Sequence, residues 1–240
     1  MKILISFLTI ILLFASCNFD DSFKYIENAF QQEVQANQSD TLKYIALGDS
    51  YTVGTGVTLE ERWSEQLVDS LLLYGYEFEP VVYVGQNGWN STALNNALNQ
   101  GLLQNTYDLV SVMIGVNDQF WNGSKNVLKD NLRCILDFSI NLAGGDTSNI
   151  LMLNIPDWGT TPVGQNFGDT ALIAASIKSY NVAIEEVADQ YGLHVSNIFP
   201  VSKAAIGDTT MVASDNLHFS GKMYGLWVDE IFPKVLDILP

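Results

Sequence analysis

The sequence predicts an α/β protein of three layers, α/β/α, in which helices cover both faces of a parallel β-sheet. Short apolar segments alternate along the chain with longer segments of helical periodicity, and this alternation is typical of such a sheet. The 240 residues are 48% hydrophobic, which is ample for the buried core of one large domain. No internal repeat or second linker interrupts the pattern, so we expect a single domain over residues 42–240.

The first strand and the first helix of this domain have clear boundary signals. Residues 43–48 form a short apolar run that leads into a Gly-rich loop, which predicts a strand. A helix is expected over residues 60–74, because Gly75 is a typical stop signal and Thr58 and Glu61 have the spacing of a capping box.

The same alternation continues to the end of the chain. In order, it predicts a strand over 80–84, a helix over 91–103, a strand over 107–114, a helix over 127–142, a strand over 150–155, a helix over 171–191, a short strand over 193–195 and a helix over 221–236. Cys134 lies in one of these apolar helical stretches, and we expect it to be a buried small hydrophobic residue rather than a nucleophile.

Charge and composition exclude several classes of function. The chain has 27 Asp and Glu residues against 11 Lys and Arg residues, a net charge of -16. A protein that binds nucleic acid needs a basic surface, so we expect no nucleic-acid partner, and the same repulsion disfavours strongly anionic substrates. Two Cys and two His residues are too few for a thiolate zinc site or a disulfide scaffold, and we expect no metal and no cofactor.

The N-terminus has the pattern of an export signal. Lys2 precedes an apolar run over residues 3–14, which is too short for a membrane span of roughly 20 residues. The segment ends in Ala15 and Ser16 directly before Cys17, and it resembles a bacterial lipoprotein signal, in which cleavage before the Cys is followed by lipidation. The alternatives are an ordinary cleaved signal peptide and a retained N-terminal anchor.

A lipidated Cys17 would fix the organisation of the whole chain. Residues 1–17 would be the signal peptide, and the polar residues 18–41 would form a tether between the lipid and the domain. The expected location is the cell envelope, either the periplasm or the outer-membrane surface. We expect contact with the membrane only through the lipid anchor, and a monomeric protein.

Four motifs place polar residues next to the ends of predicted strands. Residues 48–51 (Gly-Asp-Ser-Tyr) follow the first strand, Gly88 follows the second, and residues 115–118 (Gly-Val-Asn-Asp) follow the third. The carboxyl ends of parallel strands share one edge of the sheet, so these loops are expected to converge where open α/β sheets bind ligands. Asp215 and His218 form the fourth motif, directly before the last helix.

These residue types are suited to nucleophilic catalysis. A serine hydroxyl needs a base that accepts its proton, and a histidine needs a carboxylate that fixes its tautomer. Ser50, His218 and Asp215 supply this set. The backbone N–H groups of Ser50 and Gly88 and the side-chain amide of Asn117 are candidate donors to an oxyanion.

Other polar residues near these motifs are expected to have structural roles. Asp49 and Asp118 are expected to brace their loops by accepting hydrogen bonds from backbone N–H groups. His194 lies in the short fifth strand and is expected to be structural as well.

The four motifs, in this order, resemble the sequence blocks of the SGNH, or GDSL-type, esterase/lipase family. The resemblance implies a flavodoxin-like sheet of order 2-1-3-4-5 and an acylhydrolase whose nucleophile is Ser50, with His218 as base and Asp215 as its partner. It also implies an oxyanion hole formed by Ser50, Gly88 and Asn117. Two features depart from the commonest form of the family: Tyr51 replaces Leu or Ile, and the loop around Gly88 is only loosely similar, so that Gly85 is the alternative glycine.

Three tryptophans lie close to the predicted edge of the sheet. Trp89, Trp121 and Trp158 are candidates to stack on a sugar or to line an acyl groove, and packing in the core is the alternative for each. Trp63 and Trp227 lie in predicted helices and are expected in the core.

The leading hypothesis is an exported serine hydrolase that deacylates a small-molecule or glycan ester, such as an acetylated glycan or a short-chain lipid ester. Two alternatives belong to other classes. Residues 48–56 also have the pattern of a Gly-rich loop that binds a phosphate or a flavin, although the Lys of a Walker motif is absent. A surface lipoprotein could also bind a glycan without catalysis.

Overall fold

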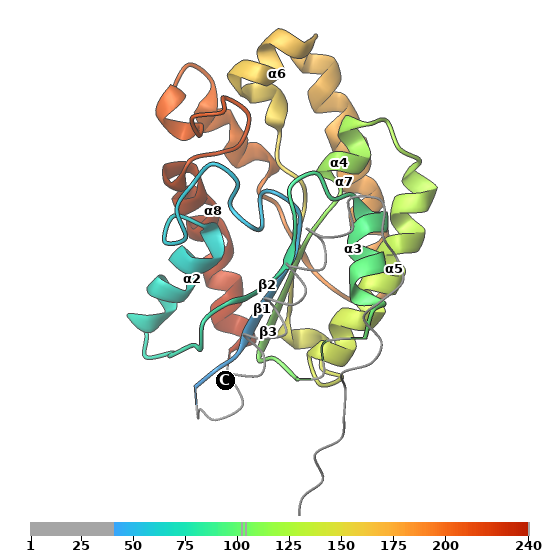
Figure 1. The fold of residues 1–240 in the computed structure, drawn as a ribbon, viewed down its shortest axis with the longest axis vertical. Helices are drawn as coiled ribbons and strands as arrows, with labels where there is room; N and C mark the ends of the chain where they lie inside the picture. Colours follow the sequence, from blue (N-terminus) through green and yellow to red (C-terminus); the bar gives the residue numbers. More distant parts are fainter. Residues whose placement is uncertain (1–40, 102, 104, 240) are drawn as a thin grey trace, which may run out of the picture.

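The computed structural model describes residues 41–239 except 102 and 104 (Figure 1). The predicted signal peptide 1–17, the lipidation site Cys17 and all but the last residue of the predicted tether 18–41 lie outside the described residues. In the part that is described, no helix is both long enough and apolar enough to span a membrane.

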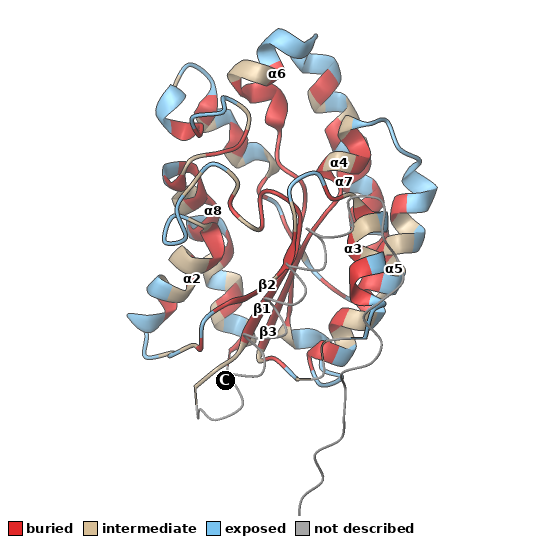
Figure 2. Ribbon diagram, viewed as in Figure 1, coloured by how far each residue is buried: buried red, intermediate tan, exposed pale blue. Residues whose placement is uncertain are grey.

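The centre of the protein is a sheet of five parallel strands. Its order is β2-β1-β3-β4-β5, as the family resemblance implied. The strands are β1 (Tyr44–Gly48), β2 (Val82–Gly85), β3 (Leu109–Met113), β4 (Ile150–Leu153) and β5 (Val195–Ser196). Every residue of β1, β3 and β4 is buried, and Figure 2 shows the sheet as the interior of the molecule. Strands that are apolar throughout therefore mark a sheet that is covered on both faces.

Helices form the two outer layers. The long ones are α2 (Trp63–Leu72), α3 (Ser91–Leu98), α5 (Lys125–Leu142), α7 (Thr170–Gln190) and α8 (Gly221–Ile238). Helices α2 and α8 cover one face of the sheet, and α3, α5 and α7 cover the other (Figure 1). Trp63 and Trp227 have no exposed surface and belong to the core, as expected.

Two short helices lie near the carboxyl edge of the sheet, and the sequence pattern did not predict them. They are α4 (Val116–Phe120), directly after β3, and α6 (Pro162–Phe167), after β4. The start of α2 also differs from the prediction. The N–H of Thr58 does donate to the Glu61 carboxylate (3.0 Å), but this bond closes a turn that precedes the helix.

The environment of Cys134 corrects one prediction. Its side chain is exposed, whereas the sequence suggested burial. The buried residues of α5 follow the helical period, and they are Leu128, Leu132, Ile135, Leu136, Ser139 and Leu142. Cys134 lies off this stripe, so its position in the period, rather than the apolar character of its neighbours, determines its exposure.

Candidate active site

Ser50 is held in a tight turn at the carboxyl end of the inner strand β1. The N–H groups of Thr52 and Val53 donate to the Asp49 carbonyl (3.1 and 3.0 Å). Gly48 permits this turn, because a Cβ atom there would lie 2.1 Å from Oγ1 of Thr52 and 2.4 Å from the Met113 carbonyl oxygen. Ser50 is thus fixed by the backbone at the edge where the strands end.

His218 and Asp215 lie in one tight hairpin before α8. Residues Val212 and Phe219 pair as an antiparallel bridge, and the N–H of Ala213 donates to the His218 carbonyl (2.8 Å). Asn216, between the two functional residues, has a φ of 61°, which Asn tolerates better than most residues. This turn brings the Asp215 side chain to the ring of His218.

Three side chains form a continuous hydrogen-bonded chain. Nε2 of His218 lies 3.0 Å from Oγ of Ser50, and Nδ1 lies 2.5 Å from Oδ2 of Asp215. With its proton on Nδ1, the imidazole donates to Asp215 and presents Nε2 as the acceptor for the Ser50 hydroxyl. Two residues separated by 168 positions thus meet at the edge of the sheet, as the sequence predicted.

The surroundings of Asp215 favour its ionised carboxylate form. Burial alone would raise the pKa of Asp215, but hydrogen bonds outweigh it and lower the pKa below the ordinary value. The largest of these bonds comes from the His218 ring, and Oδ1 also accepts the N–H groups of Leu217 and His218, both at 2.9 Å. A charged partner for Nδ1 stabilises the imidazolium that forms when His218 takes up a proton.

The predicted oxyanion donors include N–H groups that make no hydrogen bond within the described protein. Among the described residues, the N–H groups of Ser50 and Gly88 donate to no protein acceptor. Nδ2 of Asn117 donates to the Trp89 carbonyl (2.9 Å), which orients the amide and leaves its second hydrogen available. The arrangement favours Gly88 over Gly85. Gly88 is exposed in the loop with a φ of 83°, whereas Gly85 ends β2 and a Cβ there would lie 2.8 Å from the Gly48 carbonyl oxygen.

Asp49 and Asp118 brace the loops, which confirms the expectation for both. Oδ1 of Asp49 accepts the N–H of Tyr51 (3.0 Å). Asp118, on α4, accepts the N–H of Ser91 (2.8 Å) and its hydroxyl (2.6 Å), and so ties α4 to the start of α3. This bond fixes the helix that carries Asn117.

The three candidate tryptophans have different environments. Trp121 is 72% exposed on the surface, whereas Trp89 and Trp158 are 8% and 2% exposed. The indole N–H of Trp158 donates to Oε1 of Gln119 (2.7 Å). Trp89 and Trp158 therefore present no open ring face to solvent, and this bond fixes the ring of Trp158. His194 is exposed and directly precedes β5. In the described part of the chain it makes no hydrogen bond to a site residue.

Tyr51 is a component of the site whose role the sequence did not indicate. Its ring lies 5.1 Å from the His218 ring, tilted by 57°, and is 2% exposed. Phe219 and Trp227 pack against Tyr51 at 5.8 and 6.1 Å. This aromatic group supports one side of the imidazole. The signal for it was the aromatic residue next to Ser50, where the family commonly has an aliphatic one.

A hydrogen bond also joins the hairpin of His218 to α6. The N–H of Val163 donates to the Asn216 carbonyl (3.0 Å), so the first turn of α6 is fixed to the loop between Asp215 and His218. In the described residues, no group of three or more His, Cys, Asp or Glu side chains is arranged to hold a metal ion.

Asp49 gives the folded protein a pH dependence. Burial raises the pKa of Asp49 to about 7; the N–H of Tyr51 opposes this shift, and the charge of Asp118 adds to it. Oδ2 has no hydrogen-bond partner among the described residues. Because the unfolded carboxyl has a pKa of about 3.9, the folded state binds more protons between about pH 4 and 7, and its stability falls as the pH rises through that window.

Asp49→Asn is expected to remove this loss. The amide keeps an oxygen that accepts the N–H of Tyr51, and it cannot ionise. The free energy of unfolding of the variant, relative to that of the wild type, should therefore increase by about 4 kcal/mol from pH 4 to pH 8. Urea unfolding at both pH values measures the difference. Asp229→Asn, at an exposed position on α8, is the control, and a difference that does not change with pH would contradict the prediction.

Comparisons with known proteins identify a family and similar folds. Residues 46–226 match the model of the GDSL-like Lipase/Acylhydrolase family. An arylesterase of Vibrio mimicus is 31% identical over 121 residues, which are 49% of this chain and 58% of that protein, so the chain spans little more than half of this relative. The solved structure of TesA has a TM-score of 0.64 at 21% identity and covers 82% of this chain and 99% of its own. A family 3 carbohydrate esterase of Clostridium thermocellum has a TM-score of 0.59 at 22% identity, with coverages of 83% and 97%.

Proposed function

This chain belongs to the GDSL-like lipase/acylhydrolase family, and on that premise we propose that it is a serine hydrolase that cleaves carboxylic esters through an acyl-serine intermediate. The observation that carries the proposal is the hydrogen-bonded chain from Ser50 through His218 to Asp215, with distances of 3.0 and 2.5 Å. A flavin- or phosphate-binding module does not require such a chain, and it leaves the pairing of Asp215 with His218 without a role.

In the proposed mechanism each of the three side chains has its own role. Oγ of Ser50 attacks the ester carbonyl carbon while Nε2 of His218 takes the hydroxyl proton. The tetrahedral intermediate then collapses, the bond to the alcohol breaks, and His218 returns the proton to the leaving oxygen. Water repeats the sequence on the acyl-serine: His218 accepts its proton, the acid leaves, and Ser50 recovers its hydrogen. Asp215 fixes the tautomer of the neutral imidazole and stabilises the cation that forms when His218 takes up a proton.

The oxyanion of each intermediate would lie between the unused N–H groups of Ser50, Gly88 and Asn117. All three donors are uncharged, and backbone bonds in the Ser50 turn and the bond from Asn117 to the Trp89 carbonyl orient two of them in the free protein, which favours strong electrostatic stabilisation. The donors carry no positive charge that would attract an anionic substrate. The net charge of -16 also repels anionic substrates from the protein as a whole. The proposed substrates are therefore neutral esters, such as acetylated glycans or short-chain lipid esters, and no cofactor takes part.

Labelling with a fluorophosphonate probe tests the proposal. The activated serine is expected to displace fluoride and form a phosphonyl ester, and peptide mass spectrometry should locate the adduct on Ser50. Ser148→Ala, an exposed serine before β4, is the matched control and should label like the wild type. No adduct, or an adduct at another residue, would overturn the assignment. Glycan binding without any labelling would favour the non-catalytic alternative.

Asn117→Ala is expected to lower kcat by roughly 10² to 10³, the usual effect of removing one oxyanion donor. KM should change little, because the interaction strengthens in the transition state. Steady-state hydrolysis of p-nitrophenyl acetate measures both constants. The exposed Asn141→Ala, on α5, serves as control, and a change in KM alone would assign Asn117 to ground-state binding instead.

The N-terminal pattern supports the further proposal that the enzyme is a lipoprotein anchored through Cys17 in the cell envelope. Full-length protein expressed in a bacterium should incorporate labelled palmitate and partition into detergent, and Cys17→Ala should lose both properties. The exposed Cys134 provides the control, because Cys134→Ala should keep the label. Label retained in the Cys17 variant would contradict the proposal.

A further inference from the structure

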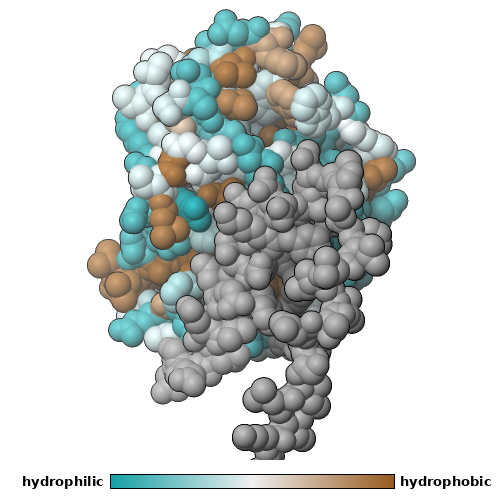
Figure 3. Space-filling model, viewed as in Figure 1, coloured by the Kyte–Doolittle hydropathy of each residue, from teal (hydrophilic) through white to brown (hydrophobic). Residues whose placement is uncertain are grey.

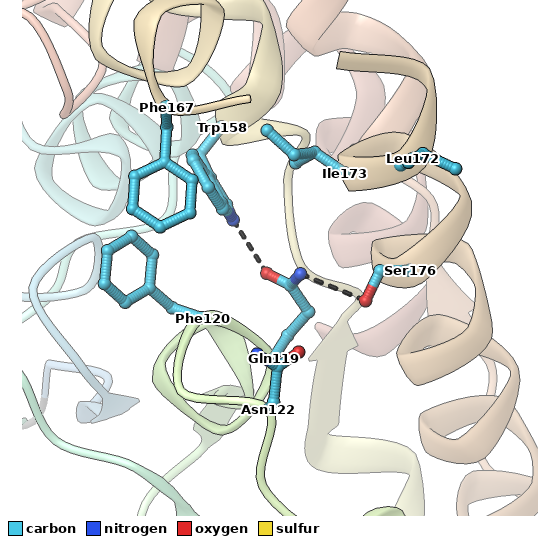
Figure 4. Close-up of a pocket in the computed structure, with 8 residues that line it drawn as sticks. All are labelled: Gln119, Phe120, Asn122, Trp158, Phe167, Leu172, Ile173 and Ser176. Carbon is cyan, nitrogen blue, oxygen red and sulfur yellow. Dashed lines mark hydrogen bonds between the residues drawn. The ribbon is translucent and has the colours of Figure 1, made fainter. Parts of the chain in front are cut away.

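A pocket of about 180 Å³ lies between α4, α6 and α7, and no role has yet been given to it (Figure 4). Aromatic rings form one wall: Phe120 lies 5.1 Å from Trp158 and 5.3 Å from Phe167, and Trp158 lies 5.4 Å from Phe167. Leu172 and Ile173, on α7, complete the apolar lining. We call this site the aromatic pocket.

Two of the three polar side chains that line the aromatic pocket, Gln119 and Ser176, are engaged in hydrogen bonds, and the third, Asn122, is exposed. Gln119 accepts the indole N–H of Trp158 (2.7 Å) and donates to Oγ of Ser176 (3.1 Å), as Figure 4 shows. These bonds fix the base of the pocket and leave few donors or acceptors for a ligand. A sugar, which carries several hydroxyl groups, would lose hydrogen bonds with water there, whereas an apolar group would not.

The mouth of the pocket is open to solvent and apolar. Phe167 and Leu172 are 61% and 69% exposed, although both are large hydrophobic residues. Hydrophobic residues gather on the surface around α6 in the space-filling view (Figure 3). Exposed apolar residues around a cavity are typical of a ligand-binding site.

Two rings of the aromatic wall belong to elements that also carry or contact active-site residues. Phe120 follows Asn117 by three residues on α4, a rise of about 5 Å along the helix. Phe167 follows Val163 by four residues on α6, and the N–H of Val163 bonds to Asn216 in the His218 hairpin. The pocket therefore begins about one helical turn from the oxyanion donor and from the hairpin that carries the base.

The volume limits what the pocket can hold. An apolar cavity of about 150 Å³ in another protein accommodates benzene, so about 180 Å³ suits a single aromatic ring or a chain of up to about six carbons. We propose that the aromatic pocket binds the apolar substituent of the ester, an aryl ring or a short alkyl chain, and holds it beside Ser50. The role of the pocket in ester hydrolysis rests on the proposed function, whereas its ability to bind an apolar group does not.

A binding measurement tests the pocket independently of catalysis. The fluorine NMR signal of 4-fluorobenzyl alcohol, which is not a substrate, should broaden with wild-type protein, and Phe167→Ala should raise the Kd at least about fivefold. Phe167 is largely exposed, so the variant should fold. Tyr74→Ala is the matched control: Tyr74 is 64% exposed and packs on Phe232 at 5.0 Å, at the end of α2. Equal Kd values for the two variants would overturn the proposal.

Kinetics identify which part of the ester enters the pocket. The KM of Phe167→Ala should rise at least about fivefold for either phenyl acetate or methyl benzoate, while methyl acetate stays unchanged. A rise for phenyl acetate places the alcohol side in the pocket, and a rise for methyl benzoate places the acyl side. Comparing each ester between variants removes the difference in leaving groups. An equal rise for methyl acetate would overturn the proposal.

The two proposals fail in different ways. Binding of the fluorinated alcohol that Phe167→Ala weakens, with no ester hydrolysed by the wild type, would refute the hydrolase and leave the pocket. Hydrolysis that requires Ser50 but is indifferent to Phe167 would refute the pocket and leave the hydrolase. Where the methyl benzoate result places the acyl side in the pocket, wild-type preference for laurate over butyrate esters would contradict the size limit.

Discussion

Ser50→Ala is expected to lower kcat for p-nitrophenyl acetate by a factor on the order of 10⁶, leaving only the weak catalysis that binding and the oxyanion donors supply. The reason is that alanine removes the nucleophile, whereas the neighbouring turn is held by backbone bonds that alanine keeps, such as the bonds from Thr52 and Val53 to the Asp49 carbonyl. Stopped assays over hours measure the residual rate, at an enzyme concentration high enough for this rate to exceed that of background hydrolysis.

The control for this variant is the unfolding transition. Ser50→Ala should unfold at nearly the same urea concentration as the wild type, so that loss of activity is not loss of structure. Ser148→Ala should keep full activity. Activity within tenfold of the wild type in a correctly folded Ser50 variant would remove this residue from the nucleophilic role and with it the acyl-serine intermediate.

Asp215→Asn is expected to lower kcat by about 10⁴, because the amide no longer fixes the His218 tautomer or stabilises its cation. The variant separates chemistry from folding. Oδ1 of Asp215 accepts the N–H groups of Leu217 and His218, and the oxygen of an amide can keep both bonds. The hairpin should therefore persist while only the bond to Nδ1 changes character. Steady-state kinetics with the p-nitrophenyl ester measure the loss.

Asp208→Asn is the matched control for the carboxylate. Asp208 also caps a turn, with Oδ1 accepting the N–H of Thr210 (2.9 Å), but it is exposed and belongs to the preceding segment. The control should change kcat less than twofold. A loss below about tenfold in Asp215→Asn would show that His218 needs no anionic partner here.

The strands and the position of Ser50 could be predicted because a single physical rule connects them. A parallel sheet aligns its carboxyl ends, so residues 48–51 and 115–118 had to lie near one another whatever the details of their loops. The bridge from Ser50 to His218 spans 168 positions in sequence and closes at 3.0 Å. The rule for strand ends places Ser50, whereas His218 lies in the hairpin before α8 and was predicted from its pairing with Asp215 and from the family resemblance. The family resemblance supplied the order of the strands, which the alternation of elements leaves open.

The short helices were missed for an equally physical reason. The five residues of α4 and the six of α6 are too few to show a helical period. Each helix begins after a residue suited to the N-cap position: Gly115, with a φ of 128°, precedes α4, and Thr161, whose hydroxyl caps the helix, precedes α6. The aromatic pocket depends on these two helices. Phe120 and Phe167 therefore had no signal in the sequence that separated them from ordinary core residues.

The bond from Val163 to the Asn216 carbonyl couples two properties that an engineer would want to vary separately. The helix that forms one wall of the aromatic pocket is the same helix that anchors the loop of the general base. Substitutions in the first turn of α6 that displace the Val163 backbone will disturb turnover on every ester, whereas changes away from this bond, at Phe167 or on α7 at Leu172, leave the anchor intact. Redesign of selectivity in this protein should start from these two positions.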